Sequence, residues 1–194
     1  MKKNLYIIAG CNGAGKTTAS FAILPAILDC KEFVNADEIA RGLSPFQPGA
    51  VAIGAGRIML HRIDELLALE NNFAFETTLA SKSYIRKVLL AQKRNFNVTL
   101  LFFWLESVEL AIERVRTRVA EGGHHVATED IERRYRNGIK NLFKVYLNVV
   151  DEVLIFDNSR TTPQLIAEKN RDSELVVWDE TKFHHLKNNY NETL

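Results

Sequence analysis

The sequence predicts an α/β fold of three layers, in which helices cover both faces of a mainly parallel β-sheet. Short apolar runs alternate with helical patterns along the chain, which is the order of elements that such sheets require. Residues 97–104 are apolar over most of their length, which is typical of a strand buried on both faces. A length of 194 residues suits one domain built around this sheet.

The composition narrows the class of protein. Hydrophobic residues make up 46% of the chain and charged residues 25%, as in ordinary globular domains. A net charge of +1, without interleaved aromatic and basic residues, argues against a nucleic-acid partner. The first apolar run is too short for a signal peptide, and no run approaches the roughly 20 residues of a membrane span. With only two cysteines, no disulfide framework is expected, so the sequence predicts a cytoplasmic protein without membrane contact.

The elements of the N-terminal half follow from apolar runs and their breaks. Residues 5–9 predict the first strand, and the next helix is expected to end near residue 28, with Pro25 able to kink it. A loop rich in proline and glycine is expected at 42–49. Ser81 can cap a helix that runs to about residue 94. The strands expected here are 5–9, 32–35 and 73–75, and the helices are 15–28, 36–41, 51–70 and 81–94.

The C-terminal half continues the alternation. A helix with an apolar stripe over 108–119 is expected to stop at Gly122-Gly123. Residues 128–130 predict the cap of the following helix, because its first turn is acidic. A short helix is expected at 163–168, and the polar tail over 179–194 is expected to be frayed or loosely helical. The strands expected here are 97–104, 153–156 and 175–178.

Residues 10–17 fit the pattern G-x-x-x-x-G-K-[ST], the phosphate-binding P-loop, between a predicted strand and a predicted helix. The glycines allow the loop to curl so that successive N–H groups point at one anion, and the helix adds the positive end of its dipole. Lys16 is expected to reach the β- and γ-phosphates and Thr17 to ligate Mg²⁺. The expected nucleotide-binding residues are Gly10, Cys11, Asn12, Gly13, Ala14, Gly15, Lys16, Thr17 and Thr18.

Acidic residues follow three of the predicted strands. Asp37 follows the second strand, Glu76 ends the third and Asp157 follows the fifth. Ligands of parallel sheets bind beyond the carboxyl ends of the strands. We therefore expect all three carboxylates on the same edge as the P-loop.

Two of these carboxylates have alternative interpretations. Asp37 can accept the proton of a substrate hydroxyl, or it can cap the helix that follows it. Glu76, with the hydroxyls of Thr77 and Thr78, can bind the substrate or a water molecule on Mg²⁺, or it can cap the strand end.

Six arginines flank a glycine hinge at Gly122-Gly123, and this arrangement describes a lid over about 114–136. Closure of such a lid would bring guanidinium groups onto the phosphoryl group in transfer. The alternative is a solvated charged face. The arginines are Arg114, Arg116, Arg118, Arg133, Arg134 and Arg136.

Other polar residues carry weaker predictions. Cys11 can be reactive or can simply occupy a variable position of the loop. His124 and His125 are adjacent, so both cannot easily face one metal ion. The segment 157–159 can contact a nucleobase or turn the chain. The chain lacks an N-K-x-D tetrapeptide and an L-S-G-G-Q-like stretch, so a GTPase switch and an ABC-type motor are not expected, and the second Mg²⁺ contact is unassigned.

Several motifs, in this order along the chain, resemble the zeta toxin family. The similarity extends from residue 4 to about residue 158, and the ordered set is more specific than any one motif. The motifs are Asn12-Gly13-Ala14-Gly15-Lys16-Thr17, Asn35-Ala36-Asp37-Glu38-Ile39, Phe75-Glu76-Thr77-Thr78-Leu79, Arg118 with Gly122-Gly123-His124-His125-Val126, and Arg133-Arg134-Tyr135.

The resemblance implies a P-loop kinase core similar to nucleotide kinases. Well-studied zeta toxins phosphorylate the 3′-hydroxyl of UDP-N-acetylglucosamine with a nucleoside triphosphate and Mg²⁺, and a separate antitoxin is implied by analogy. In this reading Asp37 would be the general base, and Lys16, Arg118 and Arg134 would act on the transferred phosphoryl group. The expected substrate contacts are Asp37, Glu76, Thr77, Thr78 and Arg133.

The sequence therefore predicts one kinase-like domain over residues 1–178, with the polar tail at 179–194. We expect an ATP- or GTP-dependent kinase that acts on a small-molecule hydroxyl, with UDP-N-acetylglucosamine as the favoured acceptor. A kinase for another sugar or metabolite is one alternative, and a non-catalytic nucleotide-binding regulatory protein is the other.

Overall fold

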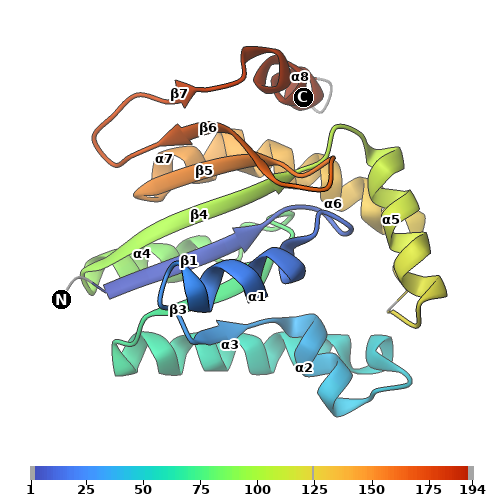
Figure 1. The fold of residues 1–194 in the computed structure, drawn as a ribbon. Coiled ribbons are helices and arrows are strands. Elements are labelled where there is room, and N and C mark those ends of the chain that lie inside the picture. Colours follow the sequence, from blue (N-terminus) through green and yellow to red (C-terminus); the bar gives the residue numbers. More distant parts are fainter. Residues whose placement is uncertain (1–2, 124, 192–194) are drawn as a thin grey trace.

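The computed structural model describes residues 3–123 and 125–191, and a seven-stranded sheet lies at the centre of this part of the chain. The strands lie side by side in the order β2-β3-β1-β4-β5-β6-β7 (Figure 1). Their bounds are β1 (Lys3–Ala9), β2 (Glu32–Val34), β3 (Phe73–Thr77), β4 (Phe96–Trp104), β5 (Glu152–Asp157), β6 (Gln164–Lys169) and β7 (Val176–Val177).

The first five strands of this order are parallel, and β6 and β7 are antiparallel to their neighbours. In β1, Leu5 pairs with Phe73 of β3 on one side and with Val98 of β4 on the other. All nine residues of β4 are buried, which agrees with its apolar sequence. The predicted α/β fold with a mainly parallel sheet is confirmed.

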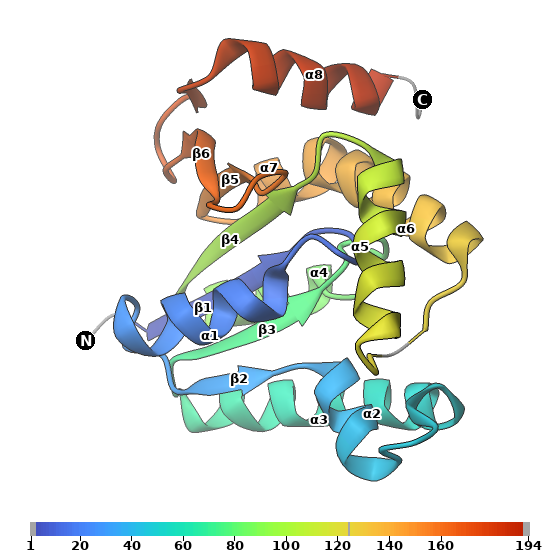
Figure 2. The ribbon, with the colours of Figure 1, turned by 45° about the vertical axis from the view of Figure 1, so that its right-hand side comes forward.

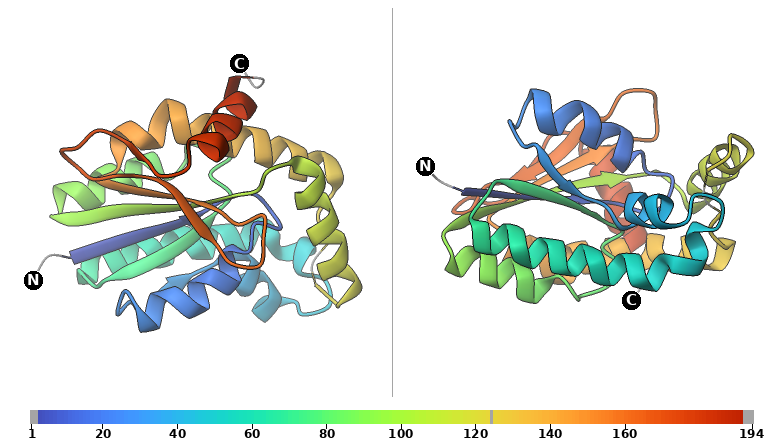
Figure 3. Two further views of the ribbon diagram at one scale, coloured as in Figure 1. Left: turned by 45° about the horizontal axis from the view of Figure 1, so that its top comes forward. Right: turned by 90° about the horizontal axis from the view of Figure 1, so that it is seen from below.

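Helices cover both faces of the sheet. Helix α1 lies on one face, and α3 and α4 lie on the other, as the view from below shows (Figure 3). A 3₁₀ turn, η1 (Pro48–Val51), precedes α3, and a π-helical turn, η2 (Leu142–Tyr146), follows α6. The helices are α1 (Lys16–Ala26), α2 (Ala36–Leu43), α3 (Ala52–Leu69), α4 (Ile85–Lys93), α5 (Val108–Ala120), α6 (Thr128–Asn141), α7 (Leu147–Val149) and α8 (Glu180–Asn191).

Two helix starts differ from those predicted. Helix α4 begins at Ile85, and the Ser81 hydroxyl accepts a hydrogen bond from the N–H of Ser83 in the preceding turn. Helix α6 begins at Thr128 after Ala127, which provides no side-chain cap, although its first turn is acidic as expected. Local capping signals compete with turns, and here the turn uses the Ser81 hydroxyl.

The helix predicted over 163–168 is wrong, because these residues form β6. This strand pairs antiparallel with β5, with Phe156 opposite Leu165. A six-residue segment cannot stabilise a helix alone. Pairing with the open edge of β5 instead provides partners for the backbone N–H and C=O groups of the segment, and it buries Ile166 and Ala167.

Residues 180–191 form helix α8, beyond the β6 side of the sheet (Figure 2). It packs on α6 and β6, with Phe183 and Leu186 buried. The division into a domain over 1–178 with a lid over about 114–136 stays a prediction. Among residues 3–123 and 125–191, every helix is too short or too polar to cross a lipid bilayer.

The burial of Leu186 makes α8 a contributor to stability. We expect Leu186→Ala to lower the free energy of unfolding by about 2–5 kcal/mol, because it leaves a cavity under the helix. Lys187→Ala, at an exposed position of the same helix, is the control. Urea denaturation measures both. Equal stability of the two variants would show that α8 does not belong to the folded core.

Candidate active site

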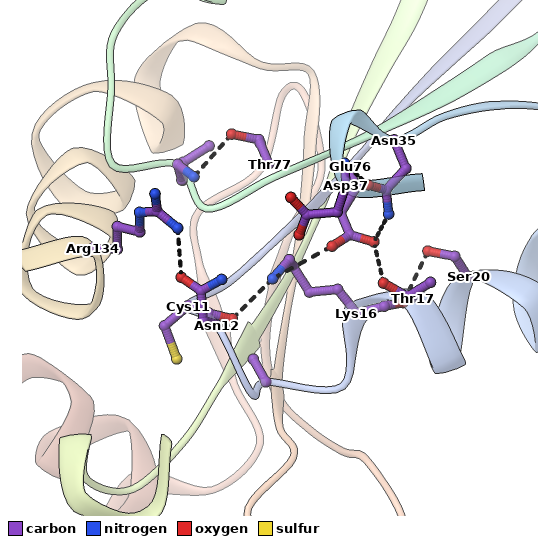
Figure 4. Close-up of polar contacts among 12 residues, drawn as sticks. Cys11, Asn12, Lys16, Thr17, Ser20, Asn35, Asp37, Glu76, Thr77 and Arg134 are labelled. Atoms are coloured by element: carbon purple, nitrogen blue, oxygen red, sulfur yellow. Dashed lines mark hydrogen bonds and ion pairs between the residues drawn. The ribbon is translucent and has the colours of Figure 1, made fainter. Parts of the chain in front are cut away.

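Several chain segments meet at the carboxyl ends of the parallel strands. The P-loop follows β1, Asn35 and α2 follow β2, Glu76 lies near the end of β3, and residues 157–159 end and follow β5. The close-up in Figure 4 shows side chains from three of these segments directed toward one another. The predicted meeting of the P-loop with these strand ends is present in the structure.

The P-loop has the curled backbone that a phosphate-binding loop requires. Gly10 and Gly15 have φ angles of 143° and 76°, in the region that favours glycine. A Cβ atom on Gly10 would lie 2.2 Å from the carbonyl oxygen of Phe103, and one on Gly15 would lie 2.5 Å from Nδ2 of Asn158. The loop therefore packs too closely on the β4 backbone for a side chain at Gly10, and a side chain at Gly15 would displace the amide of Asn158.

Residues 157–159 brace the P-loop instead of merely turning the chain. Asn158 Nδ2 donates a hydrogen bond of 2.8 Å to the carbonyl of Ala14. Arg114 of α5 donates to the carbonyls of Asn158, at 2.8 Å, and Ser159, at 2.9 Å. These bonds tie the loop, the β5 end and α5 together.

Asp157 is buried and connects α8 to the segment 157–159 that supports the P-loop. Its carboxylate lies 2.6 Å from Nζ of Lys182 and accepts hydrogen bonds from the N–H and hydroxyl of Ser159. Burial opposes ionisation of Asp157, but the Ser159 donors and the Lys182 ammonium together keep its pKa below the ordinary value. Asp157 thus serves as a support behind the loop.

A cluster of four polar side chains lies at the start of α1. Lys16 Nζ donates to the carbonyl of Cys11 at 2.8 Å and lies 3.6 Å from Oε1 of Glu76. The Thr17 hydroxyl donates to Oε2 of Glu76 at 2.7 Å, and Asn35 Nδ2 donates to the same oxygen at 2.9 Å (Figure 4). The side chains of Lys16 and Glu76 are only 7% and 9% exposed, so the ion pair is shielded from water.

The residues present fit a nucleotide with Mg²⁺. Helix α1 starts at Lys16 without a side-chain cap on its first turn, so its positive dipole end faces the loop. The Thr17 hydroxyl and the Glu76 carboxylate are adjacent oxygen ligands, the kind that Mg²⁺ prefers. Glu76, predicted as a substrate contact or a partner of a metal-bound water, thus lies beside the predicted metal ligand.

Asp37 is exposed at the start of α2 and does not cap it. The cap is Asn35, whose Oδ1 accepts from the N–H of Asp37 at 2.8 Å and from that of Glu38 at 3.4 Å. Within the described residues, the Asp37 carboxylate forms no hydrogen bond or ion pair. It lines two adjoining pockets. One, of about 180 Å³, is shared with Lys16 and Thr17, and the other, of about 360 Å³, is shared with Phe21.

The predicted arginines divide into different roles. Arg118 lines both pockets, and Arg134 Nη1 donates to Oδ1 of Asn12 in the P-loop at 3.1 Å. Arg133 points elsewhere, because its guanidinium pairs with Asp130 at 2.5 Å and is 57% exposed. Arg116 and Arg136 are exposed as well.

The remaining predicted residues lie at the margin of the site. The Thr77 hydroxyl accepts a hydrogen bond from the N–H of Leu79 and so shapes the loop after β3. Thr78 is half-buried in that loop, with its carbonyl oxygen 2.8 Å from where a Cβ on Gly138 of α6 would lie. His125 is exposed, and the prediction for His124 lies outside the described residues.

Three residues hold the site in place, although the sequence did not predict this role for them: Asn35, Asn158 and Arg114. The preference of asparagine for helix caps could have assigned one role of Asn35. Asn158 is hydrogen-bonded to a residue 144 positions away in the sequence, and Arg114 to one 44 positions away. No local pattern signals such contacts.

The sequence model of the Zeta toxin family matches residues 1–183. This chain belongs to the Zeta toxin family. The predicted resemblance is thereby confirmed. An uncharacterized protein of Haemophilus influenzae is 28% identical over 135 residues, which cover 70% of this chain and 94% of the relative.

Solved structures of low sequence identity share the fold. A chain of the AvrRxo1-ORF1:-ORF2 complex with ATP has a TM-score of 0.78 and 15% identity. The match covers 95% of the present chain but only 63% of the AvrRxo1 chain. A chain of the PezAT toxin-antitoxin system of Streptococcus pneumoniae has a TM-score of 0.63 and 15% identity, and the match covers 100% of this chain and 88% of that one. A gluconokinase of Sinorhizobium meliloti has a TM-score of 0.53 and 15% identity over 82% and 84% of the two chains. The predicted kinase-like P-loop fold is confirmed.

The Cys11 thiol is expected to be unreactive. Burial raises its pKa to about 11, although Lys16 and Arg114 favour the thiolate. Since the thiolate is the nucleophile, alkylation by iodoacetamide at neutral pH should be at least about 100-fold slower than for an ordinary thiol. Mass spectrometry of the native and the urea-unfolded chain measures this. Rapid labelling of native Cys11 would contradict the prediction.

Proposed function

We propose that this protein is a kinase that uses ATP or GTP with Mg²⁺ to phosphorylate a hydroxyl group of a small molecule. One observation carries the proposal: the Asp37 carboxylate, which has no partner among residues 3–123 and 125–191, lines the same pocket of about 180 Å³ as Lys16 and Thr17. A base and a triphosphate site that share a pocket can bring an alcohol and a phosphoryl group together. The family and the fold support nucleotide-dependent phosphoryl transfer.

In this reaction the P-loop residues from Gly10 to Thr18 bind the phosphates. Thr17 and Glu76 would hold Mg²⁺, which supplies neutralisation of phosphate charge. Lys16 stabilises the same charge from inside the loop. Arg118 at the pocket and Arg134 beside Asn12 stabilise the charge that develops in the transition state.

Asp37 orients the acceptor hydroxyl and accepts its proton. The hydroxyl oxygen forms the new O–P bond while the bond from the γ-phosphorus to the bridging oxygen breaks, and the nucleoside diphosphate leaves. A carboxylate without a partner in the described part of the chain is available for this proton.

The acceptor we favour is UDP-N-acetylglucosamine, on the basis of the family. The adjoining pocket of about 360 Å³ is lined by the aromatic ring of Phe21, by Pro48 and by Arg41, a mixture that suits a polar ligand with a ring. Thr77 and Thr78 are proposed as acceptor contacts after β3. Another sugar or metabolite hydroxyl fits the same chemistry.

A separate antitoxin is a proposed partner, because the PezAT neighbour comes from a toxin-antitoxin system. A cytoplasmic location and the absence of nucleic-acid and membrane partners stay predictions from composition.

The role of Asp37 can be tested by substitution. Asp37→Ala is expected to lower phosphoryl transfer by about 100- to 10,000-fold, because the acceptor loses its proton acceptor. The affinity for the nucleotide should be nearly unchanged. Asp64→Ala, an exposed carboxylate on α3, is the control. Labelled ATP measures transfer and calorimetry measures affinity. Triphosphate turnover that survives Asp37→Ala would overturn the assignment of the base.

The acceptor can be tested by thermal shift. A ligand at a hundred times its Kd stabilises the native state by about 2.7 kcal/mol, which raises the melting temperature. We expect UDP-N-acetylglucosamine to stabilise the protein more than other hydroxyl metabolites do. A panel of UDP-sugars and sugars, with uridine as control, decides this. If no UDP-sugar raises the melting temperature, a different metabolite is the acceptor.

A further inference from the structure

The side chain of Asn35 connects the start of α2, which carries Asp37, to Glu76 beside the P-loop. It lies between the end of β2 and the start of α2 and is only 5% exposed. Its Oδ1 accepts hydrogen bonds from the N–H groups of Asp37 and Glu38, and its Nδ2 donates to Oε2 of Glu76 (Figure 4).

Both ends of the amide are therefore used, each toward a different element. The acceptor end fixes the first turn of α2, from which the Asp37 side chain projects. The donor end fixes the Glu76 carboxylate, on which Lys16 and Thr17 of the P-loop converge. Among short side chains, an amide offers an acceptor and a donor at once, whereas a carboxylate is acceptor-only when ionised.

We propose that Asn35 is a positioning residue for phosphoryl transfer, which sets the distance between the Asp37 carboxylate and the group formed by Lys16, Thr17 and Glu76. This inference rests on the proposed kinase function. Asn35 lines neither of the two pockets that Asp37 lines. It acts through the backbone of α2 on one side and through Glu76 on the other.

Two substitutions separate the donor role from the helix cap. Asn35→Ser and Asn35→Asp both keep a side chain that is favoured as a helix cap, so α2 should stay folded. Asn35→Asp has no donor for Glu76 when ionised, and Asn35→Ser draws its hydroxyl back by one bond, away from Oε2 of Glu76. Asn35→Asp in addition places a second negative charge beside the Glu76 carboxylate, and the two like charges repel each other.

We expect kcat for transfer from Mg²⁺-ATP to UDP-N-acetylglucosamine to fall by about 10- to 100-fold in both variants, because misplacement of the base by a fraction of an ångström is costly. The KM for ATP should change by less than about threefold, since Lys16 and Thr17 remain.

Asn72→Asp is the matched control. Asn72 lies at the opposite end of β3, and its Oδ1 accepts from the N–H of Asn4 at 2.9 Å, an interaction that a carboxylate retains. Its kcat and its KM for ATP should equal those of the wild type. Melting temperatures of all variants, measured alongside, detect any loss of folded protein.

The outcomes separate this inference from the proposed function. If the wild type neither transfers phosphate nor hydrolyses ATP, the kinase function fails and the role of Asn35 fails with it. If the wild type hydrolyses ATP without transfer to this acceptor, the same comparison is made on hydrolysis. If the wild type is active and both Asn35 variants match it in kcat, the kinase function stands and the positioning role is overturned. A fall in kcat that in both variants follows a loss of melting temperature would also overturn that role.

Discussion

The carboxylate of Glu76, whose side chain is only 9% exposed, is the group on which the arrangement of the candidate site depends. A charge removed from water costs several kcal/mol unless opposite charges and donors surround it. Lys16 supplies the charge, and Thr17 and Asn35 supply the donors. These residues belong to α1 and to the end of β2, whereas Glu76 belongs to β3. The need to satisfy one group thus holds three elements in a fixed relation, and the position of the Asp37 backbone follows from it.

The sequence predicts both the fold and the edge of the sheet at which the candidate site lies, because both follow from the arrangement of parallel strands. Parallel strands present their carboxyl ends at one edge, so residues that follow separate strands meet there. The rule required only the strands and their direction, and both were apparent from apolar runs such as residues 97–104. The P-loop, Asp37 and Glu76 accordingly lie where the strand order predicts.

The finer assignments required information that a sequence does not contain. Arg133 and Arg134 are neighbours in α6, about 100° apart around the helix axis, so only one of them can face the P-loop. Which one does depends on how α6 rotates against the sheet, and the structure selects Arg134. The brace made by Asn158 and Arg114 likewise depends on contacts between distant segments. Strand β6 shows the same limit, since its pairing partner decides its conformation.

The two outermost strands of the sheet, β2 with three residues and β7 with two, are both short. Long exposed edges invite other chains to add strands, and short ones offer few free backbone groups for this. At one edge of the sheet this protection depends on the C-terminal strands, because β6 pairs with the longer strand β5 and β7 pairs with β6. A fragment that ends before residue 164 would keep the P-loop, Asp37 and Glu76, yet it would lose the Lys182 partner of Asp157 and leave the edge of β5 open to self-association.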